Sequence, residues 1–443
     1  MTAQERTIEG LPPHLRRWVV VQDYAAYTEV DQQTWRTLLG RLTAQLASTA
    51  HPRYLAGLAS TGIAVDRIPS LDEMNERLAP LGWGAVAVRG FIPPAVFTEL
   101  QSRRVLAIAV GIRRPEHLEY TPAPDIVHES AGHAPFIADP RYAEYLRRCG
   151  EVGWKAIAAA EDRAVFEAVR DLSVVKEDAR ATPEELALAE GRLGAAIASV
   201  PFASEGARAS RLYWWTAEYG LVGDLASPRI YGAGLLSSVG EAARCLGPGV
   251  RRLPLEAGCA EVAFDITRMQ PQLFVARDFE QLFEVLEAFA ATLSFRRGGD
   301  HGLGEALRAR TVVQLALPGG RELCGRVAGL EAAGATVAPG LSAALARLEG
   351  PVLRSRCGHA EGGWFDGPAL VAFGSAPPLP QGRFRLALET GLSLGGFHLG
   401  GGEVLELAGS LRGRPLALPR WALLEVAAGL PSVSGGAAGV AAG

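Results

Sequence analysis

Two hydrophobic patterns divide the chain into a long helical part and a shorter part built from strands. From about residue 35 to residue 100 the apolar residues recur at helical spacing, which predicts packed amphipathic helices. Another amphipathic helix is expected to begin at Asp278. Residues 104–112, RVLAIAVGI, form a short apolar run that fits either a buried strand or a buried helical turn.

Two helix starts can be placed from capping residues. Ser70 and Glu73 have the spacing of a capping box at the start of SLDEMNERLAPLGW. Residues 156–204 are rich in Ala and Glu, and within them Thr182 precedes a proline and stands three residues before Glu185. An N-cap, a proline at the first helical position and a glutamate at the third indicate a helix start. We therefore expect a peripheral helical insertion at about 156–204.

The pattern changes after residue 299 to short strands between glycine turns. The segments TVVQLAL, GRFRLALE and EVLELAG alternate apolar and polar residues, as half-buried strands do. The final residues, SGGAAGVAAG, carry nothing that could be buried and are expected to fray. The prediction is an α+β protein, with a mainly α-helical catalytic domain followed by a small all-β domain. Its expected parts are an N-terminal extension (1–16), the helical domain (17–300), the β-rich accessory domain (303–432) and a flexible tail (433–443).

Composition and charge exclude several classes of function. The 443 residues include 44 Lys plus Arg and 48 Asp plus Glu, which gives a formal net charge of −4, so no basic field favours nucleic acid or anionic lipid. No window is apolar for long enough to span a membrane, and the polar start resembles no signal peptide. Five cysteines without CxxC spacing predict buried free thiols and no disulfide framework. These observations predict a cytoplasmic protein whose partners are small molecules.

The candidate chemistry lies in residues 120–144, YTPAPDIVHESAGHAPFIADPRYAE, which hold two of the eight histidines. His128 and His133 are five residues apart, and on an ideal α-helix they would point roughly 140° away from each other. The second histidine is therefore expected to leave the helix. Gly132 is suited to end a helix there and to let His133 turn back toward a metal that His128 faces.

Two imidazoles and one carboxylate on one face of an octahedron are the ligands of non-haem Fe(II) oxygenases. Glu218 is the candidate carboxylate, because it stands among aromatic residues in RLYWWTAEYGLVGD, where a buried charge is costly unless a cation compensates it. A zinc hydrolase with Glu129 as general base is the rival from another class. That rival predicts HExxH spacing, which this chain lacks. A third alternative is a binding protein that senses an aromatic amino acid without turnover.

Three segments closely resemble the catalytic domain of the pterin-dependent aromatic amino acid hydroxylases. They are YTPAPDIVHESAGHAP, LYWWTAEYGL and YGAGLLSSVGE, in that order. Weaker similarity extends from about residue 27 to about Phe295, which is about two thirds of the chain. The resemblance implies an Fe(II)- and tetrahydropterin-dependent monooxygenase that uses O2 to hydroxylate the ring of a free aromatic amino acid, closest to a phenylalanine 4-monooxygenase. Hydroxylation of tryptophan, or at the meta position, stays open as an alternative.

The resemblance also assigns roles to single positions. It implies that His128, His133 and Glu218 bind iron, and that Glu129 and Trp214 act in catalysis. The positions implied to bind the amino acid are Arg113, at its carboxylate, and Thr121, Pro124, Trp214, Gly234 and Ser237. The positions implied to face the pterin are Phe97, by stacking on its ring, Glu129 and Tyr213. The pterin loop departs from the family pattern and reads GFIPPAVF, so Phe91 and Ile92 are expected to contact the pterin only through their backbone. The function of the β-rich domain, the pterin used and the oligomeric state are not readable from the sequence.

Overall fold

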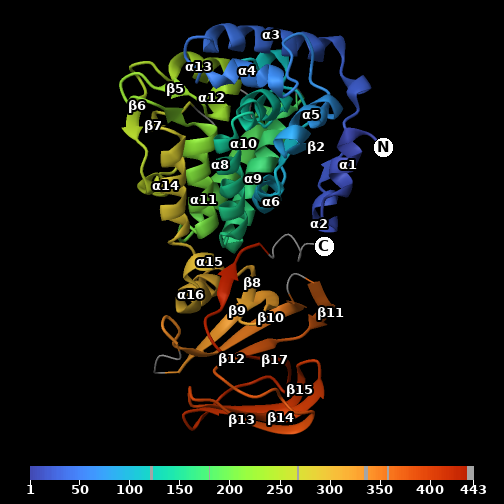
Figure 1. Ribbon diagram of the computed structural model, residues 1–443, viewed down its shortest axis with the longest axis vertical. Helices are drawn as coiled ribbons and strands as arrows, with labels where there is room; N and C mark the ends of the chain where they lie inside the picture. Colours follow the sequence, from blue (N-terminus) through green and yellow to red (C-terminus); the bar gives the residue numbers. More distant parts are fainter. Residues whose placement is uncertain (120–122, 179, 267–268, 334–337, 357–358, 437–443) are drawn as a thin grey trace. The chain divides into compact units, whose positions relative to one another are not determined.

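The structure is a computed structural model in two compact units (Figure 1). It describes all residues except 120–122, 179, 267–268, 334–337, 357–358 and 437–443. The first unit comprises Met1–Trp154 and Glu161–Ala290, and the second comprises Lys155–Ala160 and Ala291–Gly443. The first unit is mainly helical and the second is mainly a β-sheet. The expected α+β class, with helices first and strands afterwards, is confirmed.

The first unit surrounds two small sheets with helices. One sheet has three strands in the order β1-β2-β3, and the other has four in the order β5-β4-β7-β6. The strands are β1 Val19–Val20, β2 Gly84–Val88, β3 Val105–Ala109, β4 Leu221–Val222, β5 Arg229–Ile230, β6 Arg251–Pro254 and β7 Gln272–Ala276. The helices are α1 Ala3–Glu9, α2 Pro13–Arg16, α3 Glu29–Leu46, α4 Arg53–Ser60, α5 Leu71–Leu78, α6 Pro94–Ser102, α7 Ala134–Ile137, α8 Pro140–Lys155, α9 Ala160–Glu177, α10 Pro183–Ala198, α11 Glu205–Tyr213, α12 Ala233–Ser237, α13 Val239–Arg244 and α14 Phe279–Ala290, with π-helices η4 Val127–His133 and η5 Trp214–Glu218.

The apolar run at residues 104–112 contains a strand, which resolves the two alternatives left by its sequence. Strand β3 pairs in parallel with β2, and every residue of both strands is buried. Helix α6 connects the two strands. A parallel pair covered on both faces needs apolar side chains on both faces, so its strands show no alternation. The chain leaves β3 toward the histidine motif.

The first residues are part of the helical unit and not an extension, contrary to the expectation for residues 1–16. The backbone N–H of Gln4 donates to Asp72 Oδ1 (2.9 Å), and Thr7 Oγ1 donates to Asn75 Oδ1 (2.9 Å). Asn75 is buried and also bonds the backbone of Ala85 in β2. Helix α1 is thereby tied to α5 and to the three-stranded sheet.

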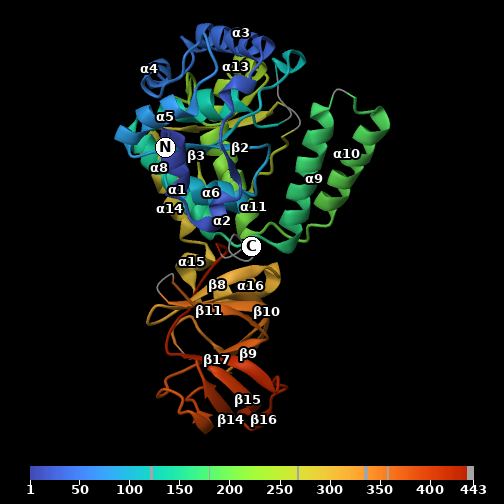
Figure 2. The same ribbon diagram turned by 90° about the vertical axis from the view of Figure 1, so that its right-hand side faces the viewer.

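The insertion consists of two helices, α9 and α10, which project from the rest of the first unit as a hairpin (Figure 2). The capping box at Thr182 and Glu185 is confirmed by reciprocal side-chain and backbone bonds. The one expected at Ser70 and Glu73 is wrong, although α5 does begin at Leu71. Gln22 Oε1 accepts a bond from the N–H of Leu71 (2.8 Å), so a side chain distant in sequence satisfies the first N–H of this helix.

In its described residues, the second unit is a sheet of eleven strands with two helices. Its main path runs β13-β14-β15-β17-β12-β10-β9-β8-β18, with β11 paired to β10 and β16 paired to β15. The elements are α15 Ser294–Arg297, α16 Gly299–Ala309, β8 Val312–Leu317, β9 Arg321–Ala332, β10 Ala343–Arg356, β11 His359–Asp366, β12 Ala369–Phe373, β13 Gly382–Ala387, β14 Leu392–Gly400, β15 Glu403–Leu411, β16 Arg414–Pro415, β17 Trp421–Ala427 and β18 Ser432–Ser434. The period-two segments thus form strands, as predicted.

The boundaries of the second unit differ from the predicted ones. Helix α16 begins before residue 303, and its Leu303 and Ala306 are buried in the core of the sheet. Ile157 is buried in the same core, so the short segment Lys155–Ala160 belongs to this unit. Strand β18 pairs with β8 where a tail was expected to begin, and residues 437–443 lie outside the described residues. The apolar residues that extend this unit stand singly or in very short segments. They form no long periodic pattern, so the sequence did not indicate where the unit begins and ends.

Two further expectations concern thiols and membranes. Cys149, Cys245, Cys259 and Cys324 are free and buried, as predicted, while Cys357 lies outside the described residues. Among the helices that the structure describes, none combines the length and the apolar character that crossing a membrane requires.

Candidate metal centre

The two histidines of the motif lie on one continuous π-helix. Residues Val127–His133 form η4, which runs directly into α7. The i→i+5 hydrogen bonds of a π-helix bring residues five apart onto the same face. The His128 and His133 rings are 5.1 Å apart between centroids and nearly perpendicular (87°). The prediction that His133 leaves the helix is therefore wrong, because the helix changes its pitch instead of ending.

Gly132 has a packing role instead of the predicted helix-ending role. A Cβ atom at this position would lie 2.7 Å from the carbonyl oxygen of Ala233 and 3.0 Å from its Cβ. Glycine therefore allows α12 to approach η4 at backbone distance. Helix α12 carries Ser237, which contacts His128, so the close approach places a polar neighbour beside a candidate ligand.

A second π-helix supplies the carboxylate. Helix α11 passes into η5, which ends at Glu218. His128 Nε2 lies 3.2 Å from Glu218 Oε2, and His133 Nε2 lies 3.1 Å from Glu218 Oε1. His133 and Glu218 are buried, and His128 is partly buried. Among the described residues, these three form the group of His, Cys, Asp or Glu side chains able to hold a metal ion.

The donor atoms suit a six-coordinate iron ion. Metal–ligand bonds of about 2.1 Å at right angles would separate neighbouring donors by about 3 Å. The two histidine–glutamate distances are 3.1 and 3.2 Å, and the ligand atoms of all three residues lie within 4.8 Å of one another. Two imidazoles and one carboxylate leave positions open for other ligands, as in the Fe(II) facial triad.

Burial and charge act in opposite directions on the two glutamates near the histidines. Burial raises the pKa of Glu218, but the charges of His133 and His128 and their hydrogen bonds outweigh it, and the net pKa lies well below the usual value. Burial raises the pKa of Glu129 to about 8, with a smaller opposing effect from His133. The site thus keeps one carboxylate ionised beside the imidazoles, as a metal ligand requires.

Ser237 fixes the tautomer of His128. The hydroxyl of Ser237 donates to the carbonyl oxygen of Ala233 (2.7 Å), and it lies 2.9 Å from His128 Nδ1. Since its proton is used on the carbonyl, the serine oxygen accepts, and His128 Nδ1–H donates. His128 would then present the lone pair of Nε2, the atom that faces Glu218, to a bound metal.

A comparison with family models identifies the chain. The model described as "Biopterin-dependent aromatic amino acid hydroxylase" matches residues 21–169 and 192–297. The chain belongs to this family. The match spans both π-helices and the helix that carries Ser237, and its break at residues 170–191 falls within the α9–α10 hairpin. The family assignment suggested by the three motifs is confirmed.

Curated relatives match more than half of the length of this hydroxylase. The chain is 30% identical over 307 residues to a phenylalanine-4-hydroxylase of Ralstonia nicotianae, covering 69% of this chain and 82% of that protein. It is 32% identical over 265 residues to the phenylalanine-4-hydroxylase of Pseudomonas aeruginosa, covering 59% and 83%. A crystal structure of Chromobacterium violaceum phenylalanine hydroxylase with iron(III) and 7,8-dihydrobiopterin has 29% identity and a TM-score of 0.49, covering 65% of this chain and 90% of that chain.

Arg113 is held in the hydroxylase by an acidic residue that the sequence analysis missed. Its Nε and Nη2 donate to the two carboxylate oxygens of Asp125 (2.7 and 2.8 Å), and its Nη1 donates to the carbonyl oxygen of Ser237 (3.0 Å). Asp125 also accepts from the backbone N–H of His128 (3.0 Å). Burial raises the pKa of Asp125. The charge and hydrogen bonds of Arg113 lower this pKa by a larger amount, so the net shift is downward. The position of Asp125 three residues before His128 was the available signal.

The other predicted substrate positions are placed differently from one another. Trp214 stacks between Phe264 (4.3 Å) and Tyr219 (4.5 Å), and Gly234 packs against Tyr219, where a Cβ atom would lie 2.7 Å from the ring. Pro124 is half-buried just before η4. Thr121 lies outside the described residues. Phe264 was also missed, since nothing in its local sequence marks it as the partner of Trp214.

The predicted pterin residues form a chain of aromatic contacts that leads to the histidines. Phe97 meets Tyr213 edge-on (5.8 Å), and Tyr213 lies 6.3 Å from the His133 ring. The Tyr213 hydroxyl donates to Gln101 Oε1 (3.1 Å), a partner that the sequence did not indicate. Phe91 and Ile92 are half-buried between β2 and α6, and Ile92 packs against the apolar core there.

Replacing Ser237 by alanine is expected to weaken iron binding by roughly 10- to 100-fold, the usual effect of removing a hydrogen-bond partner from a metal-ligating histidine. Among the described residues His133 Nδ1 has no hydrogen-bond partner, so the histidine pair has no second support of this kind. The measurement is a competition titration with a chromophoric Fe(II) chelator. Replacement by threonine keeps the hydroxyl and serves as the control, and equal affinity of the alanine variant and the wild type would contradict the role.

Replacing Glu241 by glutamine is expected to stabilise the protein at pH 8 but not at pH 5. Burial raises the pKa of Glu241 from 4.5 to about 7. Between pH 4.5 and pH 7 the folded state therefore keeps this proton while the unfolded state has lost it. The free energy of unfolding falls as the pH rises through this range. The difference is roughly 3 kcal/mol at most. Urea unfolding followed by circular dichroism at both pH values measures it, and an equal gain at both values would contradict the assignment.

Proposed function

We propose that the hydroxylase is an Fe(II)- and tetrahydropterin-dependent monooxygenase that converts a free aromatic amino acid, preferentially L-phenylalanine to L-tyrosine. The observation that carries the proposal is the convergence of His128, His133 and Glu218 inside a chain of this family. The names of the relatives in Ralstonia and Pseudomonas support phenylalanine as the substrate. Bound iron and tetrahydropterin would supply the reduction of O2 and the hydroxylating oxidant.

We propose that the chain's own residues position the reactants and keep the site dry. Two Nε2 lone pairs and one carboxylate would hold the metal on one side only. The Ser237 hydroxyl keeps His128 in the tautomer that presents its Nε2 lone pair. The buried surroundings of His133 and Glu218 exclude water from that side, which strengthens every charge interaction there.

Arg113 is proposed to orient the amino acid through its carboxylate. Two donors of its guanidinium are engaged by Asp125 and one by the Ser237 carbonyl, which leaves two of its five N–H donors for a ligand. Asp125 would hold Arg113 in register with His128, because it bonds both residues. Thr121, Pro124, Trp214 and Gly234 are proposed to line the ring pocket, and Phe91, Ile92, Phe97, Glu129 and Tyr213 to face the pterin.

The direct test is to load the full chain with iron anaerobically and to supply a tetrahydropterin, O2 and each of phenylalanine, tyrosine and tryptophan. Mass spectrometry and chromatography identify the product. Tyrosine formed from phenylalanine, dependent on both iron and pterin, is the expected result. Dominant 5-hydroxytryptophan or meta-tyrosine would overturn the substrate choice and leave the metal site standing. Activity with zinc but not with iron would overturn the reaction class.

Replacing Trp214 by phenylalanine is expected to shift the ratio of kcat/KM for tryptophan against phenylalanine upward. The indole of Trp214 is fixed by stacking on Phe264 and Tyr219, so a smaller ring in its place would widen the slot beside Glu218. Discrimination by fit alone is on the order of 10 to 200-fold, and a change of up to about tenfold is expected. Competition assays with both substrates measure it, and an unchanged or lower ratio would remove Trp214 from the pocket.

We also propose that the protein works in the cytoplasm with small-molecule partners. Four buried free thiols fit a reducing compartment. A net charge of −4 offers nothing for nucleic acid to bind. Fractionation of the native host cells with antibodies against the chain tests the location.

A further inference from the structure

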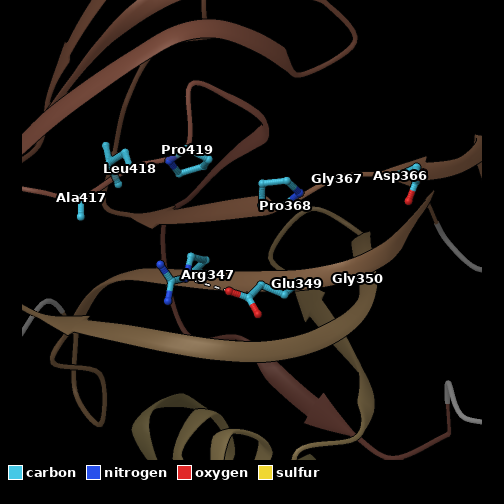
Figure 3. Close-up of a pocket in the computed structure, with 9 residues that line it drawn as sticks. All are labelled: Arg347, Glu349, Gly350, Asp366, Gly367, Pro368, Ala417, Leu418 and Pro419. Carbon is cyan, nitrogen blue, oxygen red and sulfur yellow. Dashed lines mark ion pairs between the residues drawn. The ribbon is translucent and has the colours of Figure 1, made fainter.

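The second unit contains a cavity that the proposed reaction does not use. Its volume is about 580 Å³, within the range of small-molecule sites. It lies between the middle of β10, the segment from β11 to β12 and the loop before β17, as Figure 3 shows. The lining residues are Arg347, Glu349, Gly350, Asp366, Gly367, Pro368, Ala417, Leu418 and Pro419.

Arg347 is a cation with unused donors in this cavity. It makes no hydrogen bond among the described residues, and its Nε atom is buried without a hydrogen-bond partner. Its one ion pair with a described residue is a loose contact of 3.6 Å from Nε to Glu349 Oε1. The guanidinium lies over Gly329 of β9, where a Cβ atom would be 3.4 Å from Nη2. The bare backbone of Gly329 thus supports the group, and its Nη donors remain available to a ligand.

Glu349 provides an acceptor next to this cation. Its Oε2 pairs with Arg326 Nη2 at 3.1 Å, which holds the carboxylate in place from outside the cavity. In the part of the chain that the structure describes, its Oε1 has only the loose contact with Arg347. Cation and anion therefore stand side by side, each with unfilled hydrogen-bonding capacity.

The rest of the wall is apolar around these two groups. Figure 3 shows Ala417, Leu418, Pro419 and Pro368 across the opening from Arg347 and Glu349. The side chains of proline and leucine offer surface to an aliphatic or aromatic group and carry no hydrogen-bond donor. A polyanion such as a phosphate ester is disfavoured, because two carboxylates, Glu349 and Asp366, line the cavity with one guanidinium.

We infer that this cavity is a binding site for a free α-amino acid with an apolar side chain. The carboxylate of the ligand binds the Nη donors of Arg347, its ammonium binds Glu349 Oε1, and its side chain packs against Leu418, Pro419 and Pro368. The adjacent cation and anion match the short separation of the two charges in an α-amino acid. The inference does not rest on the proposed reaction, since every residue that it uses lies in the second unit.

Protection of Arg347 from phenylglyoxal, mapped by peptide mass spectrometry on the full chain, tests the site. L-Leucine and L-phenylalanine at up to about 10 mM, a range that covers weak binding, are expected to slow modification of Arg347 several-fold. Arg385, exposed on β13, is the control arginine and should react at an unchanged rate. N-acetyl-L-leucine and L-leucinamide each lack one of the two charges and should not protect.

Variants separate this site from amino acid binding elsewhere in the chain. Arg347→Met should weaken binding of labelled L-leucine in equilibrium dialysis by roughly 10- to 100-fold, as the loss of charged hydrogen bonds does, whereas Arg385→Met should not. Glu349→Gln should abolish the protection of Arg347 while leaving it reactive. No protection by either amino acid, or equal protection by the acetylated ligand, would overturn the inference, and neither outcome bears on hydroxylation in the first unit.

Discussion

Replacement of Glu218 by glutamine is expected to abolish iron-dependent turnover and to leave the chain unable to retain iron through dialysis. The amide keeps the shape of the side chain but removes the charge beside His128 and His133, whose Nε2 atoms lie 3.2 and 3.1 Å from its oxygens. The loss should exceed the roughly 10- to 100-fold that follows from removing an outer hydrogen-bond partner. Alanine at either histidine should have the same effect, because two ligands hold Fe(II) poorly.

Iron per chain, measured by plasma mass spectrometry after anaerobic loading, reports this result apart from activity. Glu256→Gln, on an exposed glutamate outside the site, is the matched control and should retain full iron. Circular dichroism shows that each variant is folded. A Glu218→Gln chain that keeps one iron and full activity would falsify the ligand assignment.

Replacement of Gly132 by alanine is expected to lower both the stability of the fold and its affinity for iron. The new Cβ would lie 2.7 Å from the Ala233 carbonyl oxygen, a backbone atom that cannot rotate away. Overpacking of this kind costs roughly 1–3 kcal/mol. Relief requires α12 to move off η4, which would carry Ser237 away from His128. Both stability and iron affinity should therefore fall.

The matched control for Gly132 is Gly191→Ala on α10, where nothing lies within 4 Å of the added atom. Alanine in an exposed helix interior stabilises by roughly 0.5–1 kcal/mol, so the two substitutions should have opposite signs. Urea unfolding gives the stabilities and chelator competition gives the iron affinity. A Gly132→Ala chain as stable as the wild type, with unchanged iron affinity, would show that the contact with α12 is not needed.

The sequence was most informative where chemistry and local pattern coincide. His128, His133 and Glu218 could be proposed as one set from residue type and motif, and the structure brings them together. The prediction that the helix ends between the two histidines was wrong. It assumed the 3.6 residues per turn of an α-helix, and no local sequence signature indicated a π-helix. Gln101 was missed because its partner, Tyr213, lies far away in the chain. Asp125 was missed although its partner His128 is only three residues away, because no local motif marks that bond.

Helix starts and domain limits could likewise be predicted only where the residues that define them are close together in the sequence. The capping box at Thr182 was predicted correctly because all of its partners lie within four residues. Ser70 stands at a true helix start but leaves the N–H of Leu71 to Gln22, which no local pattern reveals. The strands of the second unit were visible from their alternation, but the place of Ile157 in its core was not.

The segment Lys155–Ala160 has a consequence for the order in which the chain is made. Ile157 is buried in a core otherwise formed by residues from Leu303 onward, and the Lys155 carbonyl accepts from the N–H of Gly435 (2.9 Å). Domains generally fold as they leave the ribosome, the earlier ones first. Here the segment after α8 leaves the ribosome before the residues that pack against Ile157 have been synthesised. Its last partners, β18 and Gly435, are made only after all the other strands of the sheet. The helical unit can thus fold early. The sheet is complete only when Lys155–Ala160, synthesised much earlier, packs against residues near the end of the chain.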